Sequence, residues 1–254
     1  MDSVEKPFVK TKVDNGIGTI IFGTPQHNAL PSKTLQELAE AFSKLGDDTR
    51  VSVIILKSAG NITFCAGASF DELISIRNEE EGRAFFMGFA RVILAMRSVP
   101  KLVIGVVQGK AVGGGVGLAA AMDYCFATTH SAIKLSEISI GIGPFVISPA
   151  VQRKLGISAY GKLCINASEF QTAEWAENNG LFTEIYDNQE AAGSAAYDLA
   201  CKLAEYDAKA LKALKSDLWR GTEDWPELLP AQASISGNLV LSEFTKEKLK
   251  SYKK

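Results

Sequence analysis

Two segments rich in small residues have the composition of a site for a negatively charged ligand oxygen. Residues 109–118 read Gly-Lys-Ala-Val-Gly-Gly-Gly-Val-Gly-Leu, and residues 62–70 read Ile-Thr-Phe-Cys-Ala-Gly-Ala-Ser-Phe. In the first segment, three glycines lie between an apolar strand-like run and a helix-forming run. Unpaired backbone N–H groups at the positive end of a helix dipole would face the ligand there. This pattern predicts an oxyanion site.

Known phosphate-binding and nucleophile motifs do not fit these residues. A Walker A loop needs G-x-x-x-x-G-K-[ST], but the run from Gly105 to Lys110 is one residue short and Ala111 replaces the Ser/Thr. The G-x-G-x-x-G pattern fails at Leu118 and Ala120, and no G-x-S-x-G nucleophile elbow occurs. An oxyanion site formed by backbone N–H groups remains the best interpretation.

The elements that would position these segments alternate between strand and helix in the first half of the chain. Apolar runs rich in Val, Ile and Thr at 16–22, 51–56 and 102–107 predict strands. Helical spacing predicts one helix opening at 31–33, with Ser32 as its N-cap, and another over 78–96. Such alternation predicts a mainly parallel or mixed sheet covered by helices.

Beyond about residue 158 the strand signal nearly disappears. Residues 191–204 and 208–219 have the spacing of amphipathic helices, so we expect the C-terminal third to be all helical. We divide the chain into a core over 1–190 and a helical C-terminal region over 191–254. The tail is apolar enough to pack on a neighbouring subunit; its apolar residues are Leu239, Val240, Leu241, Phe244, Leu249 and Tyr252.

Composition limits the classes of partner. The net charge of −2 and the pI near 5.8 argue against nucleic acid and anionic membranes. The N-terminus is charged and no apolar run is long enough for a membrane span, so we expect a cytoplasmic protein. The four cysteines form no C-x-x-C pair and are expected to be buried thiols, and His27 and His130 lack metal-ligand spacing. We predict no metal site.

Taken in order, several segments resemble the crotonase, or enoyl-CoA hydratase/isomerase, superfamily over nearly the whole chain. The segments that carry the resemblance are Asn28-Ala29-Leu30, Phe64-Cys65-Ala66-Gly67-Ala68, Gly113-Gly114-Gly115-Val116-Gly117-Leu118, Met122-Asp123 and residues 135–141. The resemblance implies an α/β fold, a spiral of β-β-α units followed by a helical trimerisation region, assembled as a homotrimer or homohexamer.

The resemblance also implies an acyl-CoA substrate whose thioester oxygen sits between the backbone N–H groups of Ala68 and Gly114. Ala66 and Phe70 would lie near the adenine part of coenzyme A. Coenzyme A enters as part of the substrate, so no separate cofactor is expected. Donors fixed in advance stabilise the charge that develops on the thioester oxygen when a proton moves beside it.

The carboxylates distinguish the reactions of this superfamily. Two-glutamate hydratases carry one glutamate at the position of Gly117 and the other at the position of Glu137, so this chain matches one and lacks the other. The apolar neighbours of Glu137 predict burial, which would raise its pKa toward the range useful for proton transfer. Glu137 is therefore the expected acid/base.

Several reactions stay open with one carboxylate. The first hypothesis is hydration of a 2-enoyl-CoA; the second is Δ3,Δ2-enoyl-CoA isomerisation; the third is a non-catalytic acyl-CoA-binding member. The reactions of decarboxylase and lyase members stay open as well, because these enzymes share the same oxyanion site. Residues 135–149 look most like 3-methylglutaconyl-CoA hydratases of leucine breakdown, which also have glycine at the first glutamate position. Phe145 is a departure and is expected to shape the water site beside Gly117.

Two further expectations concern the acyl group. A glutaconyl group has a distal carboxylate that would favour a cationic partner, for which Lys134, Arg153 and Arg83 are the candidates. Aromatic residues of the 78–96 helix are candidates for lining an acyl pocket; they are Phe85, Phe86 and Phe89.

Overall fold

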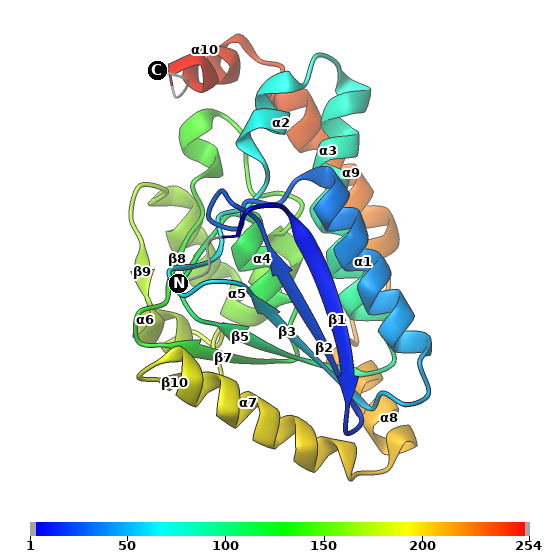
Figure 1. Cartoon of the computed structure of the whole chain (residues 1–254). Helices are drawn as coiled ribbons and strands as arrows, with labels where there is room; N and C mark the ends of the chain where they lie inside the picture. Colours follow the sequence, from blue (N-terminus) through cyan, green and yellow to red (C-terminus); the bar gives the residue numbers. More distant parts are fainter. Residues whose placement is uncertain (1–3, 252–254) are drawn as a thin grey trace.

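The computed structural model describes residues 4–251 and contains two β-sheets flanked by helices (Figure 1). The larger sheet has the order β1-β2-β3-β5-β7-β10. Its strands are β1 (Phe8–Asp14), β2 (Ile17–Gly23), β3 (Val53–Ser58), β5 (Leu102–Val107), β7 (Tyr124–Thr128) and β10 (Glu184–Tyr186). Only β1 pairs in the antiparallel sense, with β2, so the sheet is mixed, as the alternation of strand and helix predicted.

The smaller sheet positions the two small-residue segments. Its order is β4-β6-β8-β9, with β4 (Thr63–Cys65), β6 (Lys110–Val112), β8 (Ala132–Lys134) and β9 (Gln171–Thr172). Because β4 pairs in parallel with β6, and β6 with β8, the carboxyl ends of these three strands share one edge. The loops that follow the three strands therefore meet at that edge.

Two long helices of the first half begin close to where the sequence predicted. Helix α3 (Glu79–Ser98) is capped by Asn78, whose side chain accepts a hydrogen bond of 2.9 Å from the backbone N–H of Glu81. Helix α1 (Ser32–Asp47) differs from the prediction at its cap. Pro31 holds the N-cap position, and the Ser32 hydroxyl donates to the Glu72 carboxylate at 2.6 Å instead, so the predicted Ser32 N-cap is wrong.

Most of the C-terminal third is helical, with two exceptions. The helices are α5 (Ser148–Ile165), α6 (Ala173–Asn178), α7 (Gln189–Ala204), α8 (Ala208–Leu218), α9 (Trp225–Leu239) and α10 (Glu243–Ser251). The expectation of an all-helical end is wrong because β9 and β10 lie in this part. Each has only two or three residues and is held by pairing with a distant strand, β8 or β7, which leaves no local apolar run to detect.

Helix α7 does not stand apart from the core. The proposed division after residue 190 falls inside this helix, and its Ala192, Ala196 and Ala200 pack against the larger sheet beside Ile17 and Val53. In Figure 1 the helix runs along one face of that sheet. Alanines every four residues give it a narrow face, which lets it lie close to the strands.

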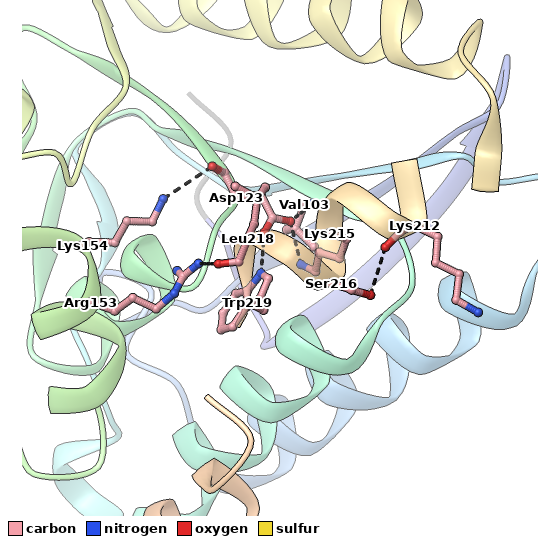
Figure 2. A network of polar contacts seen from close by, with 9 residues as sticks. All are labelled: Val103, Asp123, Arg153, Lys154, Lys212, Lys215, Ser216, Leu218 and Trp219. Carbon is pink, nitrogen blue, oxygen red and sulfur yellow. Dashed lines mark hydrogen bonds and ion pairs between the residues drawn. The ribbon is translucent and has the colours of Figure 1, made fainter. Parts of the chain in front are cut away.

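A buried polar network ties α8 to the sheet (Figure 2). The Asp123 carboxylate accepts hydrogen bonds from Lys215 Nζ at 2.6 Å, Trp219 Nε1 at 2.6 Å and the Val103 backbone N–H at 2.7 Å. Asp123 and Lys215 are almost fully buried, so the ion pair is shielded from solvent. Asp123 lies just after α4 (Gly114–Ala120), and the network thereby anchors the helix that begins at the small-residue segment.

The cysteines differ in burial. All four cysteines are free; Cys65 and Cys125 are buried as expected, but Cys164 and Cys201 are only partly buried, so for these two the expectation is wrong. Their helices lie nearer the surface than the strands that carry the other pair. Within residues 4–251, none of the helices combines the length and the apolar character required to cross a membrane.

Candidate active site

The loops after β4 and β6 lie against each other. Cys65 of β4 pairs with Ala111 of β6, and each strand then turns into small residues. Gly67 adopts a φ of +93°, and a Cβ atom there would lie 3.1 Å from the Val112 carbonyl oxygen and 3.7 Å from the Gly114 nitrogen. Glycine is therefore needed both for the backbone conformation and for the close approach of the two loops.

The backbone N–H groups of Ala68 and Gly114 are free to bind a ligand. The neighbours of Ala68 bond to Leu30, through Leu30 N–H to Gly67 O at 2.8 Å and Ser69 N–H to Leu30 O at 3.1 Å. Gly114 is the first residue of α4, where helical N–H groups have no partner within the helix. Within residues 4–251, no protein acceptor receives a hydrogen bond from either N–H.

The carboxyl group of Glu137 lies beside the same loops. Glu137 opens the 3₁₀ helix η1 (Glu137–Ile140), which follows β8, the third strand of this sheet edge. Its Oε1 atom lies 2.7 Å from where a Cβ atom on Gly113 would be, so the glycine leaves the space that the carboxylate occupies. The loops of three parallel strands thus bring together two N–H donors and one carboxyl group.

Burial adapts this carboxyl group to proton transfer. Loss of solvent raises the pKa of Glu137 from 4.5 to about 7, although the backbone N–H groups of Glu137 and Ser136 partly oppose the shift. Its Oε2 atom is buried and has no hydrogen-bond partner among the described residues. A carboxyl with such a pKa can both accept and release a proton near neutral pH.

A cavity of about 160 Å³ joins these groups. Five of the predicted site residues line it, namely Ala66, Ala68, Phe70, Gly114 and Glu137, and so do the three phenylalanines of α3. The rest of the wall is mostly apolar and comes from Leu73, Val112, Ile140, Ile142, Pro144, Val146 and Ile147, with Gly67, Gly113 and Gly143. Among the described lining residues, only Ser136, Glu137 and Ser236 have polar side chains.

Two predicted substrate-binding residues do not line the cavity. Gly117 is buried inside α4, and a Cβ atom there would lie 2.4 Å from Cγ2 of Ile147. The Phe145 ring covers Gly143, whose added Cβ would lie 2.4 Å from it. Ile147, which does line the cavity, occupies the space beside the position where two-glutamate hydratases would have their other carboxylate.

The candidate cationic residues lie elsewhere. Lys134 Nζ is 4.4 Å from the centre of the Phe170 ring, and the Arg153 guanidinium is 4.4 Å from that of Trp219. Arg83 is exposed on α3. The described residues that line the cavity include no lysine and no arginine.

Ser236 and Ile147 also line the cavity, although neither was predicted from the sequence as a site residue. Ser236 lies on α9 and reaches the cavity because α9 packs antiparallel to α3, with Gly237 against Gly82 at one end and Thr222 bonded to Arg97 at the other (Figure 1). No local pattern in the sequence signals this packing. Only the small residues Gly82 and Gly237 could have suggested a close approach of two helices.

Comparison with known proteins agrees with this geometry. Residues 12–253 match the family model described as enoyl-CoA hydratase/isomerase. A short-chain-enoyl-CoA hydratase of Clostridium acetobutylicum is 28% identical over 227 residues, covering 89% of this chain and 86% of that protein. A probable enoyl-CoA hydratase of Bacillus subtilis is 26% identical over 246 residues, with coverages of 96% and 95%.

The fold is also that of solved structures. The crystal structure of an enoyl-CoA hydratase from Bacillus halodurans superposes with a TM-score of 0.89 at 22% identity, covering 96% of this chain and 99% of that one. The protein thus has a crotonase fold, and the family match over residues 12–253 makes it an enzyme of the hydratase/isomerase type. The chain belongs to the enoyl-CoA hydratase/isomerase family.

Proposed function

We propose that this enzyme adds water across the double bond of a 2-enoyl-CoA, with Glu137 as the only carboxylate that transfers protons. The observation that carries the proposal is the convergence of one buried carboxyl and two free N–H groups on a single apolar cavity. A thioester carbonyl oxygen fits between the N–H groups of Ala68 and Gly114. Its developing negative charge is then stabilised by donors that need no rearrangement.

In this mechanism Glu137 acts twice. The ionised carboxylate takes a proton from water while the water oxygen bonds to C3 and the π electrons move onto the thioester oxygen. The protonated carboxyl then returns a proton to C2 as the enolate collapses, which gives a 3-hydroxyacyl-CoA and regenerates the carboxylate. A pKa of about 7 suits both steps.

Isomerisation of a 3-enoyl-CoA is the second candidate, and Ile147 favours it. The side chain of Ile147 fills the space beside Gly117, so no second carboxylate is available there to hold an attacking water. With the same oxyanion stabilisation, Glu137 would remove a proton from C2 and return it to C4. This reaction needs no water in the cavity.

The acyl group in the proposal carries no distal carboxylate. The resemblance to 3-methylglutaconyl-CoA hydratases suggests such a substrate, but no lysine or arginine is among the described lining residues. Moving a carboxylate out of water without a cation or several donors costs several kcal/mol. We therefore propose short 2-enoyl-CoA thioesters with an uncharged acyl chain and use 3-methylglutaconyl-CoA as a comparison substrate.

Separate incubations with 2-butenoyl-CoA, 3-hexenoyl-CoA and 3-methylglutaconyl-CoA test the proposal. Mass spectrometry detects hydration as a gain of one water, and ultraviolet absorbance detects the conjugated product of isomerisation. The proposal predicts hydration of 2-butenoyl-CoA. Conversion of 3-hexenoyl-CoA to the 2-enoyl isomer without any hydration would instead establish the second candidate.

A further inference from the structure

The buried side of the cavity contains a polar side chain that the proposed chemistry does not use. Ser236 of α9 lines the cavity and is 0% exposed, and its Oγ atom has no hydrogen-bond partner among the described residues. A buried hydroxyl without a partner is costly, because buried polar groups in folded proteins normally have a hydrogen-bond partner, either a protein group or an ordered water. The missing partner of Ser236 therefore needs an explanation. Its surroundings in the cavity are aromatic and aliphatic.

Helix packing places Ser236 away from the oxyanion site. Gly237, the next residue, packs on Gly82 at the start of α3, whereas Gly114 faces the ring of Phe89. Gly82 and Phe89 are separated by about 10 Å along the helix axis, at 1.5 Å per residue. An acyl chain whose carbonyl oxygen lies at Gly114 can reach Ser236 if it runs along α3 within the cavity.

The chemistry of this end of the cavity limits what it can bind. A serine hydroxyl can donate one hydrogen bond and accept others. Because no cationic side chain accompanies it in the described wall, it does not compensate the burial of a carboxylate. It can, however, form a hydrogen bond with an alcohol or carbonyl oxygen.

From these observations we propose that Ser236 is a specificity-determining residue that binds an uncharged oxygen, hydroxyl or keto, toward the far end of the acyl chain. The proposal rests on the proposed function, because it takes the thioester to lie at Ala68 and Gly114. Preferred substrates are then enoyl-CoA thioesters oxygenated near the end of the acyl chain. Plain hydrocarbon chains of the same length leave the Ser236 hydroxyl unpaired.

A matched pair of substrates tests the proposal, namely 2-hexenoyl-CoA and 6-hydroxy-2-hexenoyl-CoA. The measured quantity is the ratio of kcat/KM for the hydroxylated chain to kcat/KM for the plain chain. In Ser236→Ala this ratio is expected to fall roughly three- to tenfold, the value of one neutral hydrogen bond. The control is Ser234→Ala, which removes a hydroxyl already bonded to Pro230 O on the same helix and should leave the ratio unchanged.

Binding measurements keep the two proposals distinguishable. Calorimetry with hexanoyl-CoA and 6-hydroxyhexanoyl-CoA, which are saturated and unreactive, measures the corresponding ratio of Kd values without any turnover. If the wild type binds both but converts no enoyl-CoA, the proposed function fails while Ser236 can still be judged. Two results for Ser236→Ala would overturn the proposal: an equal loss of kcat/KM and of affinity for both chains, or no change in either measurement. Either result would show that the hydroxyl has a structural role, for example by pairing with Gln232 one turn earlier.

Discussion

Burial of the Glu137 carboxyl raises its pKa to about 7, and this affects catalysis and stability in opposite directions. At neutral pH the group exchanges protons readily, which the proposed reaction requires. The same burial makes the ionised form unfavourable in the folded protein. Because the folded-state pKa exceeds the ordinary value of 4.5, the carboxyl contributes its full stability below pH 4.5 and loses that contribution as the pH rises through 7.

The substitution Glu137→Gln tests this relation, since a glutamine has nearly the same shape but does not ionise. The quantity of interest is the free energy of unfolding of the variant minus that of the wild type. We expect this difference to be more positive at pH 8 than at pH 4.5 by on the order of 1–3 kcal/mol. Urea unfolding at both pH values measures it. A difference that stays the same at pH 4.5 and pH 8 would mean that the carboxyl is well solvated.

At the scale of elements, sequence patterns located those that have strong local signals. The strand expected at 102–107 is β5 with the same bounds, and α3 begins one residue from the expected start. The strands β9 and β10 could not be predicted because their two or three residues are stabilised by distant partners. The same holds for the site. The glycine segments could be predicted from the local sequence, whereas the position of Ser236 depends on how α9 packs on α3.

The contact between α3 and α9 requires glycine at its closest point. A Cβ atom at Gly82 would lie 2.7 Å from the Gly237 carbonyl oxygen, so Gly82→Ala forces the helices apart and should destabilise the protein by about 1–3 kcal/mol. Gly193→Ala in α7 is the control, because nothing lies within 4 Å of its added Cβ and helix propensity predicts a gain of about 0.5–1 kcal/mol. Thermal unfolding of both variants measures the contrast. Equal effects would contradict the packing argument.

The Asp123 network should also dominate the stability of α8. Lys215→Met leaves the buried carboxylate without its cation, and breaking a buried pair in this way typically costs about 3–5 kcal/mol. On the same helix, Lys212 is exposed, so Lys212→Met should change stability by less than about 0.5 kcal/mol. Chemical denaturation of the two variants compares them. Similar midpoints would show that Asp123 does not depend on Lys215.

At the scale of the whole molecule, the resemblance to the crotonase superfamily predicted more of the structure than the periodicity of apolar residues did. Ordered motifs gave the fold and the enzyme family, which the family match and the solved structures confirm. Subunit assembly as a trimer or hexamer stays a prediction. It agrees with large apolar side chains exposed on α5, where Ile157 and Ile165 are 71% and 87% exposed. In the predicted apolar tail, Val240 and Leu249 are buried within the chain, Phe244 is exposed, and Tyr252 lies outside the described residues.

The central claim is that one carboxyl group, assisted by two backbone N–H groups, transfers the protons. Steady-state turnover of 2-butenoyl-CoA and 3-hexenoyl-CoA by Glu137→Gln, compared with wild type between pH 5 and 9, tests it most directly. We predict that wild-type kcat/KM rises with pH through a pKa near 7, because the ionised form of Glu137 is required. In the variant, kcat/KM should be lower by about a hundredfold or more. Turnover by Glu137→Gln equal to that of wild type, with the same pH profile, would contradict it.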